Sequence, residues 1–449
     1  MFSVQRDLDL ALWKNQLTAA PYLSYLYSYP HKTAYREFEP PLSLPALWEQ
    51  EQGDSFFLYM HIPFCAMRCG FCNLFTLPDR RDDVHEVYIN ALEKQARQWA
   101  PFVGHRPASR LAIGGGTPTL LNEGLLDRLF IIAEDTMKVD LRTTSISVEA
   151  SPDTVTEGRL SLLKQRTVDR VSMGIQSFTD TETTAIHRPQ KKNEVERALE
   201  LLKKYDFPIL NLDLIYGLPG QTTASWLYSL DSALAYEPEE IFIYPLYTRE
   251  NTFLKPEQVK QSGQDIRMEC YRLACDKLAS AGYAQHSMRR FSKPIAKPSK
   301  ELLPFSCQEE GMIGLGCGAR SYTRGVHYAS RYGVSYKATK SIIADYVDTV
   351  DYTRADYGYV LSLAEQKRRF ILKAILHREG LLLTDYGQRF GTAALDDYPE
   401  LYRLVRIGFA HISEGLLLLT DEGLGYSDAI GDWLISDSVR ELMHEHVLL

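Results

Sequence analysis

Short β-rich runs alternate with amphipathic segments between about residue 56 and residue 250. The predicted strands, rich in β-branched and aromatic residues, are 56–62, 110–114, 145–150, 170–176, 209–217 and 240–247. The predicted helices, whose apolar residues recur every three or four positions, are 85–99, 125–137, 193–204 and 222–235. This alternation predicts βαβ units and a parallel sheet of the α/β class. Periodicity does not decide whether the six strands form an open sheet, a closed barrel or a partial barrel.

The segments on either side of this region have different patterns. Residues 1–50 are rich in Tyr and Pro and predict an ordered arm. The polar, proline-containing segment 285–310 predicts a long loop. Near the end of the chain, helical patterns at 364–376 and 401–412 come before a strand and turn at 415–423. Helices followed by a β-turn wing favour a small α+β domain of winged-helix type.

These patterns predict four parts of the chain. They are an N-terminal arm (1–50), an α/β core (51–284), a linker with a glycine-rich extension (285–354) and a C-terminal domain (355–449).

Composition and charge exclude several classes of protein. The 449 residues are 45% hydrophobic and 24% charged, which is enough apolar material for a folded core and excludes a wholly disordered chain. The formal charge of −8 argues against a nucleic-acid-binding protein. No apolar run reaches the roughly 20 residues of a membrane helix, and the first residues lack a secretory signal, so we expect no membrane partner. The seven cysteines do not resemble a disulfide framework, which favours a reducing, cytoplasmic compartment.

Three of the cysteines form the sharpest chemical feature of the sequence. Cys65, Cys69 and Cys72 have the spacing C-x3-C-x2-C directly after the first predicted strand. Three thiolates can each bind one iron of a four-iron cluster and leave the fourth iron open to a reactant. The alternatives are structural zinc, which needs a fourth ligand at compact spacing, and plain buried thiols.

Polar residues at the ends of later strands form a second candidate feature. Gly114–Thr117 follows the second predicted strand, where glycines allow a ligand to approach the backbone closely. Glu149, Gln176 and Asp213 lie at or near the ends of the next three strands, the edge at which parallel α/β proteins form their sites. Polar side chains in buried strands are costly unless they find partners. Ligand binding and hydrogen bonding to loops would both supply such partners.

The cysteine loop and its flanks resemble the radical S-adenosylmethionine (radical SAM) superfamily. The likeness is greatest to the HemN-like branch of oxygen-independent coproporphyrinogen III oxidases. That branch also includes a haem chaperone, haem-degrading enzymes and radical methyltransferases. The segments that carry the resemblance are YMHIPFC (59–65), GGGTPT (114–119), VEASP (148–152), SMGIQSF (172–178) and DLIYGLP (213–219).

The resemblance implies a fold, two cofactors and a set of site residues. The fold is a partial (β/α)6 TIM-type radical SAM barrel with an N-terminal arm and a C-terminal α+β winged-helix-like domain. The cofactors are a [4Fe-4S] cluster on Cys65, Cys69 and Cys72, and SAM. The residues that the resemblance assigns to SAM are Tyr59, Phe71, Gly115, Gly116, Thr117, Glu149, Gln176, Arg188 and Asp213, with Pro245 near the adenine and 314–319 near a second SAM.

The resemblance also implies an enzyme that cleaves SAM reductively. The resulting 5′-deoxyadenosyl radical would abstract hydrogen from an organic substrate, with tetrapyrroles among the candidates. An electron donor such as flavodoxin or ferredoxin would be a partner. The alternatives are a radical methyltransferase that uses two SAM molecules and a haem-binding chaperone without turnover. Asn73 follows Cys72 where the oxidase commonly has another cysteine, so the substrate stays open.

Two further features have a weaker interpretation. The segment 28–30 (Ser-Tyr-Pro) resembles an arm that covers the active site in the oxidase, and an arm without a chemical role fits it equally well. Cys270, Cys275, Cys307 and Cys317 lack the close spacing of a second cluster.

Overall fold

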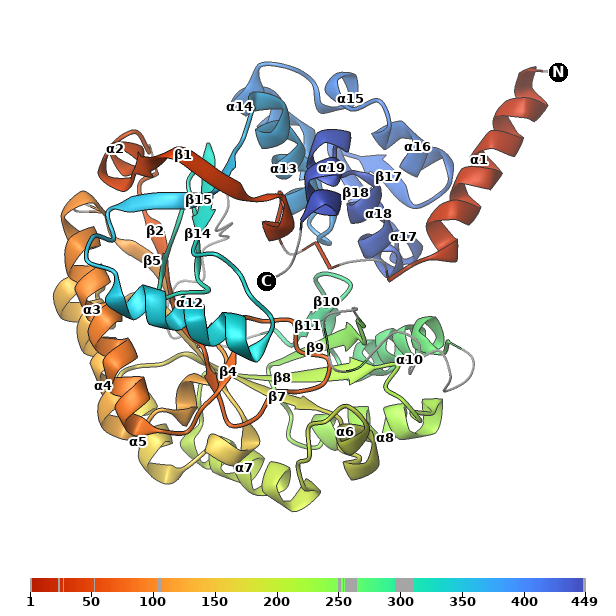
Figure 1. Ribbon diagram of the computed structural model, residues 1–449. Helices are drawn as coiled ribbons and strands as arrows, with labels where there is room; N and C mark the ends of the chain where they lie inside the picture. The colour runs from red at the N-terminus through yellow and green to blue at the C-terminus, as the bar shows by residue number, and fades with distance from the viewer. Residues whose placement is uncertain are drawn as a thin grey trace. The chain divides into compact units, whose positions relative to one another are not determined.

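The computed structural model describes the chain in two compact units (Figure 1). The described residues are 2–22, 25–26, 28–51, 53–103, 106–248, 252, 254, 265–294 and 311–446, without the side chains of 2–9. The larger unit comprises Arg36–Lys277 and Lys293–Val360, and the smaller unit comprises Met1–Tyr35, Leu278–Ser292 and Leu361–His446. The four-part division predicted from the sequence stays a prediction. No helix among the described residues is long and apolar enough to cross a membrane.

Six parallel strands form the centre of the larger unit. They are β2 (Phe56–Ile62), β5 (Ala108–Gly115), β6 (Ser145–Ala150), β7 (Arg170–Gln176), β8 (Ile209–Tyr216) and β9 (Glu240–Pro245). Each pairs in parallel with the next in the order of the chain. All six predicted strands are present, and this (β/α) arrangement confirms the α/β fold class.

Helices connect the six strands. They are α3 (Asp82–Val103), α4 (Glu123–Ile131), α5 (Glu157–Gln165), α6 (Asp180–Ala185), α7 (Lys192–Tyr205) and α8 (Thr223–Leu234). Side-chain caps at Asn122, Thr156 and Thr222 begin α4, α5 and α8 by accepting a hydrogen bond from a backbone N–H of the first turn. The predicted helix 125–137 is α-helical only as far as Ile131 and continues as a π-helical segment, Ile132–Thr136.

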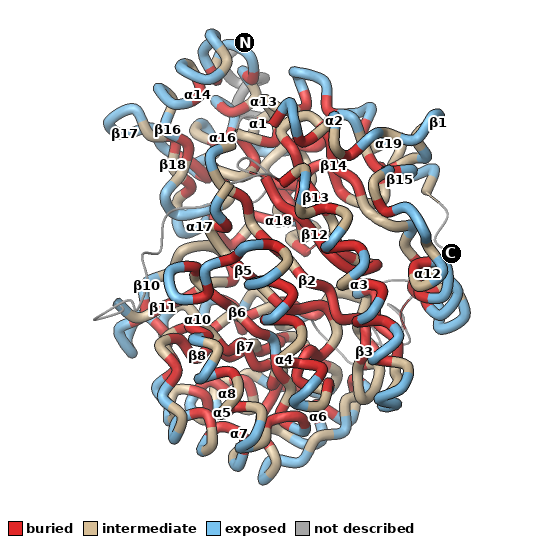
Figure 2. Tube along the Cα trace, turned by 90° about the vertical axis from the view of Figure 1, so that its left-hand side faces the viewer, coloured by how far each residue is buried: buried red, intermediate tan, exposed pale blue. Residues whose placement is uncertain are grey.

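The two faces of this sheet differ in character. One face carries fully buried apolar residues, such as Leu58 and Leu212, and Figure 2 shows buried residues along these strands. The opposite face carries Tyr59, Glu149 and Arg170, which alternate with apolar residues along their strands. Because side chains alternate across a strand, the helices cover the apolar face and the opposite face is left free for polar groups.

The sheet continues on the other side of β2. The additional strands are β12 (Met312–Leu315), β13 (Arg320–Tyr322), β14 (Val326–Ala329), β15 (Arg354–Val360) and β1 (Arg36–Ser43). Strand β12 runs parallel to β2, and the remaining pairs are antiparallel. Tyr59 is therefore opposite Gly314 on one side and Ala112 on the other.

The last part of the smaller unit has the order of elements of a winged helix. Its elements are α13 (Leu363–Ile375), β16 (Leu381–Leu382), α14 (Leu383–Phe390), α15 (Ala394–Asp397), α16 (Leu401–Arg406), β17 (Ala410–Ser413) and β18 (Leu416–Leu419). The three strands form an antiparallel sheet in the order β16-β18-β17. A C-terminal α+β domain of winged-helix type was predicted from the sequence.

Two boundaries in the smaller unit correct the sequence prediction. The predicted helix 401–412 ends at Arg406, because Gly408 takes a positive φ of 80° and Ala410 begins β17. The predicted loop 285–310 begins instead as a hairpin of β10 (Ala284–Gln285) and β11 (Arg290–Ser292). Its residues 295–310 lie outside the described part of the chain.

The N-terminal segment is anchored within the smaller unit. Tyr29 is fully buried, its hydroxyl donates a hydrogen bond to Glu365, and its oxygen lies 3.1 Å from the Ser436 hydroxyl. The ring of Tyr25 lies 3.8 Å from the guanidinium of Arg289. Helix α1 (Phe2–Ala19) comes before this segment. These contacts give the segment 25–29 a structural role in its own unit.

We expect Tyr29→Phe to destabilise the smaller unit by about 1–3 kcal/mol, because Glu365 loses a buried hydrogen-bond donor. Urea unfolding followed by circular dichroism measures the change. Tyr402→Phe is the matched control, since Tyr402 is 49% exposed and should lose nothing measurable. Equal stability of the two variants would contradict the structural role of Tyr29.

Candidate functional site

The predicted site residues gather at the carboxyl ends of the parallel strands. The cysteine loop follows β2, Gly116 and Thr117 follow β5, and Glu149 and Gln176 end β6 and β7. The carboxyl ends of neighbouring parallel strands meet at one edge of the sheet, where open α/β sheets form their sites. The structure therefore places these residues at one edge of the sheet, as the order of the strands in the sequence predicted.

The cysteine loop is closed at its base and docked at its tip. The two-residue strand β3 (Phe64–Cys65) pairs with β4 (Leu77–Pro78) and ties the two ends of the loop together. Within the loop, the Cys72 N–H donates to the Cys69 carbonyl over 3.1 Å. The Gly70 N–H donates to the Ile186 carbonyl over 2.8 Å, and a Cβ at Gly70 would lie 3.0 Å from that oxygen. A glycine at this position therefore allows the loop to approach the segment before Arg188 closely.

Each of the three thiols has a polar partner near its sulfur. The Thr117 hydroxyl donates to Cys65 Sγ over 3.7 Å, and Arg188 Nη1 donates to Cys69 Sγ over 3.2 Å. The Thr76 hydroxyl lies 3.8 Å from Cys72 Sγ. Donors of this kind stabilise the thiolate form of cysteine, which is the form that binds metal.

The thiols also influence one another electrostatically. Burial raises the pKa of Cys65 to about 12, and the nearby charges of Cys72 and Cys69 add to the rise. Burial and the charge of Cys69 likewise raise the pKa of Cys72, while the charge of Arg68 opposes the rise. Three thiolates at this spacing therefore need positive charge among them to be stable.

The donor set fits an iron–sulfur cluster. A four-iron cluster with one open iron takes one thiolate at each of three irons, and three thiols with thiolate-stabilising partners are present. Among the described residues, no three His, Cys, Asp or Glu side chains are placed to hold a single metal ion.

The glycine segment after β5 packs directly on the cysteine loop. The N–H groups of Gly116 and Thr117 donate to the carbonyls of Ile62 and Phe64 over 2.7 and 2.8 Å. A Cβ at Gly116 would lie 2.5 Å from the Phe64 carbonyl oxygen and 2.9 Å from Cys65 Sγ. Only glycine fits at this position, because the backbone packs directly on the cysteine loop. The approach of a ligand to this segment stays a prediction.

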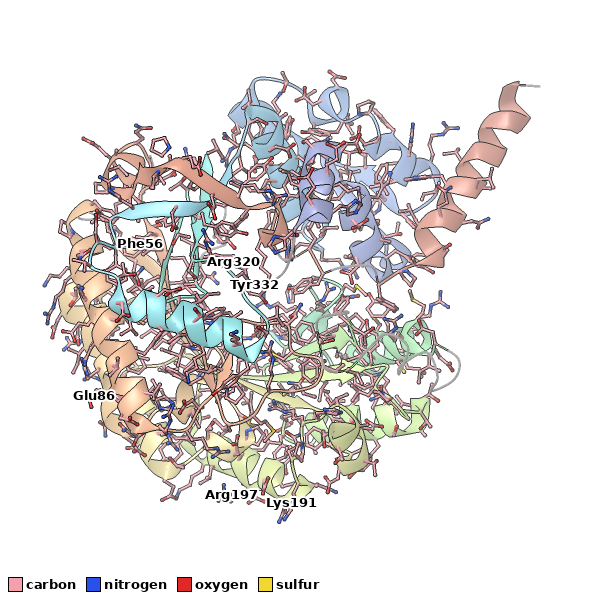
Figure 3. All side chains as sticks on the ribbon, viewed as in Figure 1. Phe56, Glu86, Lys191, Arg197, Arg320 and Tyr332 are labelled. Carbon is pink, nitrogen blue, oxygen red and sulfur yellow. The ribbon has the colours of Figure 1, made fainter. Side chains whose placement is uncertain are left out.

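Glu149 links this segment to Tyr59. Glu149 Oε2 accepts a hydrogen bond from the Gly115 N–H over 2.9 Å, and Gly115 has a φ of 116°. The Glu149 side chain is open to solvent, yet surrounding atoms desolvate it enough to raise its pKa. Burial and the charge of Glu149 raise the pKa of Tyr59, and the charge of Arg320, a β13 residue labelled in Figure 3, opposes this rise. Gly115 and Glu149 are thus hydrogen-bonded at the edge of the sheet, and the charge of Glu149 acts on Tyr59 within β2.

Arg188 connects the cysteine loop to two strands. Besides the Cys69 sulfur, its guanidinium donates to the Gly174 carbonyl over 2.7 Å and to the Ser151 hydroxyl over 3.2 Å. Its Nε donates to Gln190 Oε1 over 3.2 Å. Ser151 was not among the site residues predicted from the sequence. It lies in the segment 148–152, one of the segments that carry the family resemblance, and this position could have indicated it.

Gln176 ends β7 in an unusual conformation. Its φ of 71° is in the left-handed region, and the register with β8 shifts between Gly174 and Gln176. A Cβ at Gly174 would lie 2.6 Å from Gln176 Nε2. Such conformations cost about 1–3 kcal/mol and cluster at functional sites. The bulge therefore directs the Gln176 side chain back over β7, toward the position that Arg188 occupies.

Asp213 lies in a hydrogen-bonded network on β7 and β8. Asn211 Nδ2 donates to Asp213 Oδ1 over 2.9 Å and to the Ser172 hydroxyl over 2.7 Å. Burial raises the pKa of Asp213, and the hydrogen bond from Asn211 opposes the rise.

An ion pair lies beside this network. Arg170 Nε donates to Glu240 Oε2 over 2.7 Å, and Arg170 Nη1 donates to the Ser147 hydroxyl over 3.1 Å. The positive charge of Arg170 also opposes the rise in the pKa of Asp213. Arg170, Ser172, Asn211 and Glu240 were not predicted from the sequence, although polar residues at alternate positions of β7, β8 and β9 were a signal.

Other predicted residues have different surroundings. Phe71 packs against the buried apolar cluster of Ile186, Ile215, Leu218, Leu246 and Leu254, and Pro245 ends β9. Gly316 and Gly318 have positive φ, and a Cβ at Gly318 would lie 2.9 Å from His61 Nε2. Cys270 and Cys317 are buried free thiols, whereas Cys307 lies outside the described residues.

Comparison with known proteins gives the class of this domain. Residues 59–233 match the family model of the Radical SAM superfamily. The solved structure of the coproporphyrinogen III oxidase HemN from Escherichia coli, described as a radical SAM enzyme, has the same fold at a TM-score of 0.77. The two proteins are 22% identical, and the match covers 91% of this chain and 96% of that one. The chain therefore contains a radical SAM domain and has the fold predicted from its cysteine loop.

Sequence relatives narrow the branch. The chain is 27% identical over 372 residues to "Heme chaperone HemW" of Bacillus subtilis, which covers 81% of this chain and 95% of the relative. It is 27% identical over 449 residues to "Oxygen-independent coproporphyrinogen III oxidase" of Salmonella typhimurium, which covers 94% of each. The chain is thus similar to HemN and HemW proteins over most of its length, and relatives with both names leave its specific activity open.

We expect Asp213→Asn to stabilise the protein at neutral pH when no ligand is bound. Its raised pKa means that the folded chain takes up this proton more readily than the unfolded chain. The stabilisation that comes from protonating Asp213 is fully present below about pH 3.8. It is lost as the pH rises through the raised pKa of the folded protein. The melting temperature of the variant should therefore exceed that of the wild type at pH 7, and the difference should narrow toward pH 4. Asp140→Asn is the control. The pKa of this exposed carboxyl is lowered, so removing its charge should not raise the melting temperature at pH 7.

We expect Gly116→Ala to destabilise the protein by about 1–3 kcal/mol and to reduce the iron that it holds after anaerobic reconstitution. The added methyl group would push the Phe64 carbonyl and Cys65 Sγ out of place. Gly124→Ala is the matched control, since its new Cβ would meet nothing closer than 3.5 Å. Equal iron content in both variants would show that the contact between Gly116 and the cysteine loop is unimportant.

Proposed function

We propose that the protein is a cytoplasmic radical SAM enzyme that holds a [4Fe-4S] cluster on Cys65, Cys69 and Cys72. The observation that carries this proposal is the set of three thiols on one closed loop, each with a polar group at its sulfur. When bound, the cluster supplies an electron that cleaves SAM reductively, and the resulting radical abstracts hydrogen from the substrate.

The residues at the strand ends would hold SAM. The Glu149 carboxylate suits an ammonium group, and Gly115 orients that carboxylate through its N–H. Arg188 has the charge to pair with a carboxylate, and the Asp213 carboxylate suits hydroxyl groups of a ribose. Gln176, Gly116 and Thr117 lie at the same edge, and with Tyr59 of β2 they would complete the surroundings of SAM.

The polar character of this edge supports ligand binding. Burial raises the pKa values of both Glu149 and Asp213. Gln176 is in a strained conformation. A desolvated carboxylate is stabilised by a group of opposite charge bound beside it. These two carboxyl groups therefore favour a charged cofactor over a purely structural network.

A tetrapyrrole is the substrate class that we propose. One relative is named as a coproporphyrinogen oxidase and the other as a heme chaperone, and both names refer to tetrapyrroles. We propose oxidation of a porphyrinogen as the reaction, and haem binding without turnover is the second candidate. The electron donor would be a small redox protein such as flavodoxin or ferredoxin.

Anaerobic reconstitution tests the proposal. The protein is loaded with iron and sulfide, reduced with dithionite and mixed with SAM, and bound iron and 5′-deoxyadenosine are quantified. We expect iron loading and SAM cleavage in the wild type, and loss of both in Cys69→Ala. Cys275→Ala is the matched control, because this cysteine lies on α10 (Arg267–Ser280), away from the loop.

The outcomes separate the candidate functions. Release of CO2 from coproporphyrinogen together with 5′-deoxyadenosine supports the oxidase. A haem absorption band that saturates on titration, without SAM cleavage, supports the chaperone. A wild-type protein that holds zinc and no iron would contradict the whole proposal.

A further inference from the structure

Arg68 is a cation inside the cysteine loop without a visible partner. It lies between Cys65 and Cys69, and its side chain is only partly exposed. Within the described part of the chain, its Nη2 is buried and has no hydrogen-bond partner. A buried guanidinium is costly unless an anion or an acceptor compensates it.

The second arginine at the thiols has no such deficit. Arg188 donates to Cys69 Sγ, to the Gly174 carbonyl, to the Ser151 hydroxyl and to Gln190. Its position is therefore explained by neighbouring acceptors of the protein. The buried Nη2 of Arg68 is explained by none of these groups, although the loop places it next to the metal ligands.

Arg68 lies in the cysteine loop, three residues after Cys65 and directly before Cys69. Its buried, unpartnered Nη2 therefore belongs to the same short loop as the three thiols. A metal cluster on three thiolates is anionic, and one-electron reduction makes it more so. A fixed positive charge beside it therefore stabilises the reduced form more than the oxidised form.

We propose that Arg68 is the counter-charge of the iron–sulfur cluster and raises its reduction potential. This inference rests on the proposed function, because it needs a cluster on Cys65, Cys69 and Cys72. The electron comes from an external one-electron reductant, enters the cluster and requires no proton. Arg68 is a positioning residue for charge and takes no part in bond making.

Potentiometry of the loaded protein tests the inference. Anaerobic samples of wild type, Arg68→Gln and Arg68→Lys are poised at a series of potentials, and the signal of the reduced cluster is measured by electron paramagnetic resonance. We expect the equilibrium constant for reduction to fall about tenfold in Arg68→Gln, which is about 59 mV for one electron. Arg68→Lys keeps the charge and should stay closer to the wild type.

A charge-matched control excludes a general effect of net charge. Arg97 on α3 has 71% of its side chain exposed, so Arg97→Gln removes one positive charge far from the loop environment. Its midpoint potential should equal that of the wild type, because solvent screens an exposed charge.

The midpoint potential of Arg68→Gln tests the inference even if this variant holds less iron, because the potential is measured on the clusters that are present. An unchanged midpoint in Arg68→Gln would overturn the inference. A drop of equal size in Arg97→Gln would overturn it as well. Failure of the proposed function would look different, since the wild type itself would then show no iron–sulfur signal.

Discussion

The site depends on holding three buried thiols together against their own electrostatics. Each of Cys65 and Cys72 has a pKa raised by burial and by the neighbouring thiols, so the ionised loop is unfavourable without positive charge. The fold counters this tendency by closing the loop through the β3–β4 pair and by aiming Thr117 and Arg188 at two of the sulfurs. The thiol loop is therefore arranged for a metal that supplies the missing charge.

The surroundings of the loop follow from the same requirement. Gly116 and Gly70 allow backbone to approach the loop where a side chain would collide, and Arg188 joins it to the ends of β6 and β7. These contacts join the thiol loop to the edge of the sheet at which Glu149 and Gln176 lie near the ends of β6 and β7. Loop and strand ends thus form one site, although they are far apart in the sequence.

Much of this was predictable because the signals are local. The six strands have apolar, β-branched cores, and the spacing of Cys65, Cys69 and Cys72 is contained within eight residues. The strands β12 to β14 were missed because they have only three or four residues, and β15 was missed because Asp356 and Gly358 interrupt its apolar residues. The helix predicted to extend to residue 412 failed at Gly408, where a positive φ ends the helix and overrides the helical spacing of the apolar residues. Arg170 and Glu240 could not be paired from the sequence, since their contact depends on the register of β7, β8 and β9.

The most direct test of the central claim asks whether the cluster and SAM share one site. The reduced, reconstituted protein is examined by electron paramagnetic resonance before and after SAM is added, in the wild type and in Glu149→Gln. Binding of SAM at the cluster predicts a changed spectrum in the wild type and a higher SAM concentration for half-maximal change in Glu149→Gln. A cluster spectrum that stays identical at saturating SAM would contradict the account, because the thiol loop and the strand ends would then not form one site.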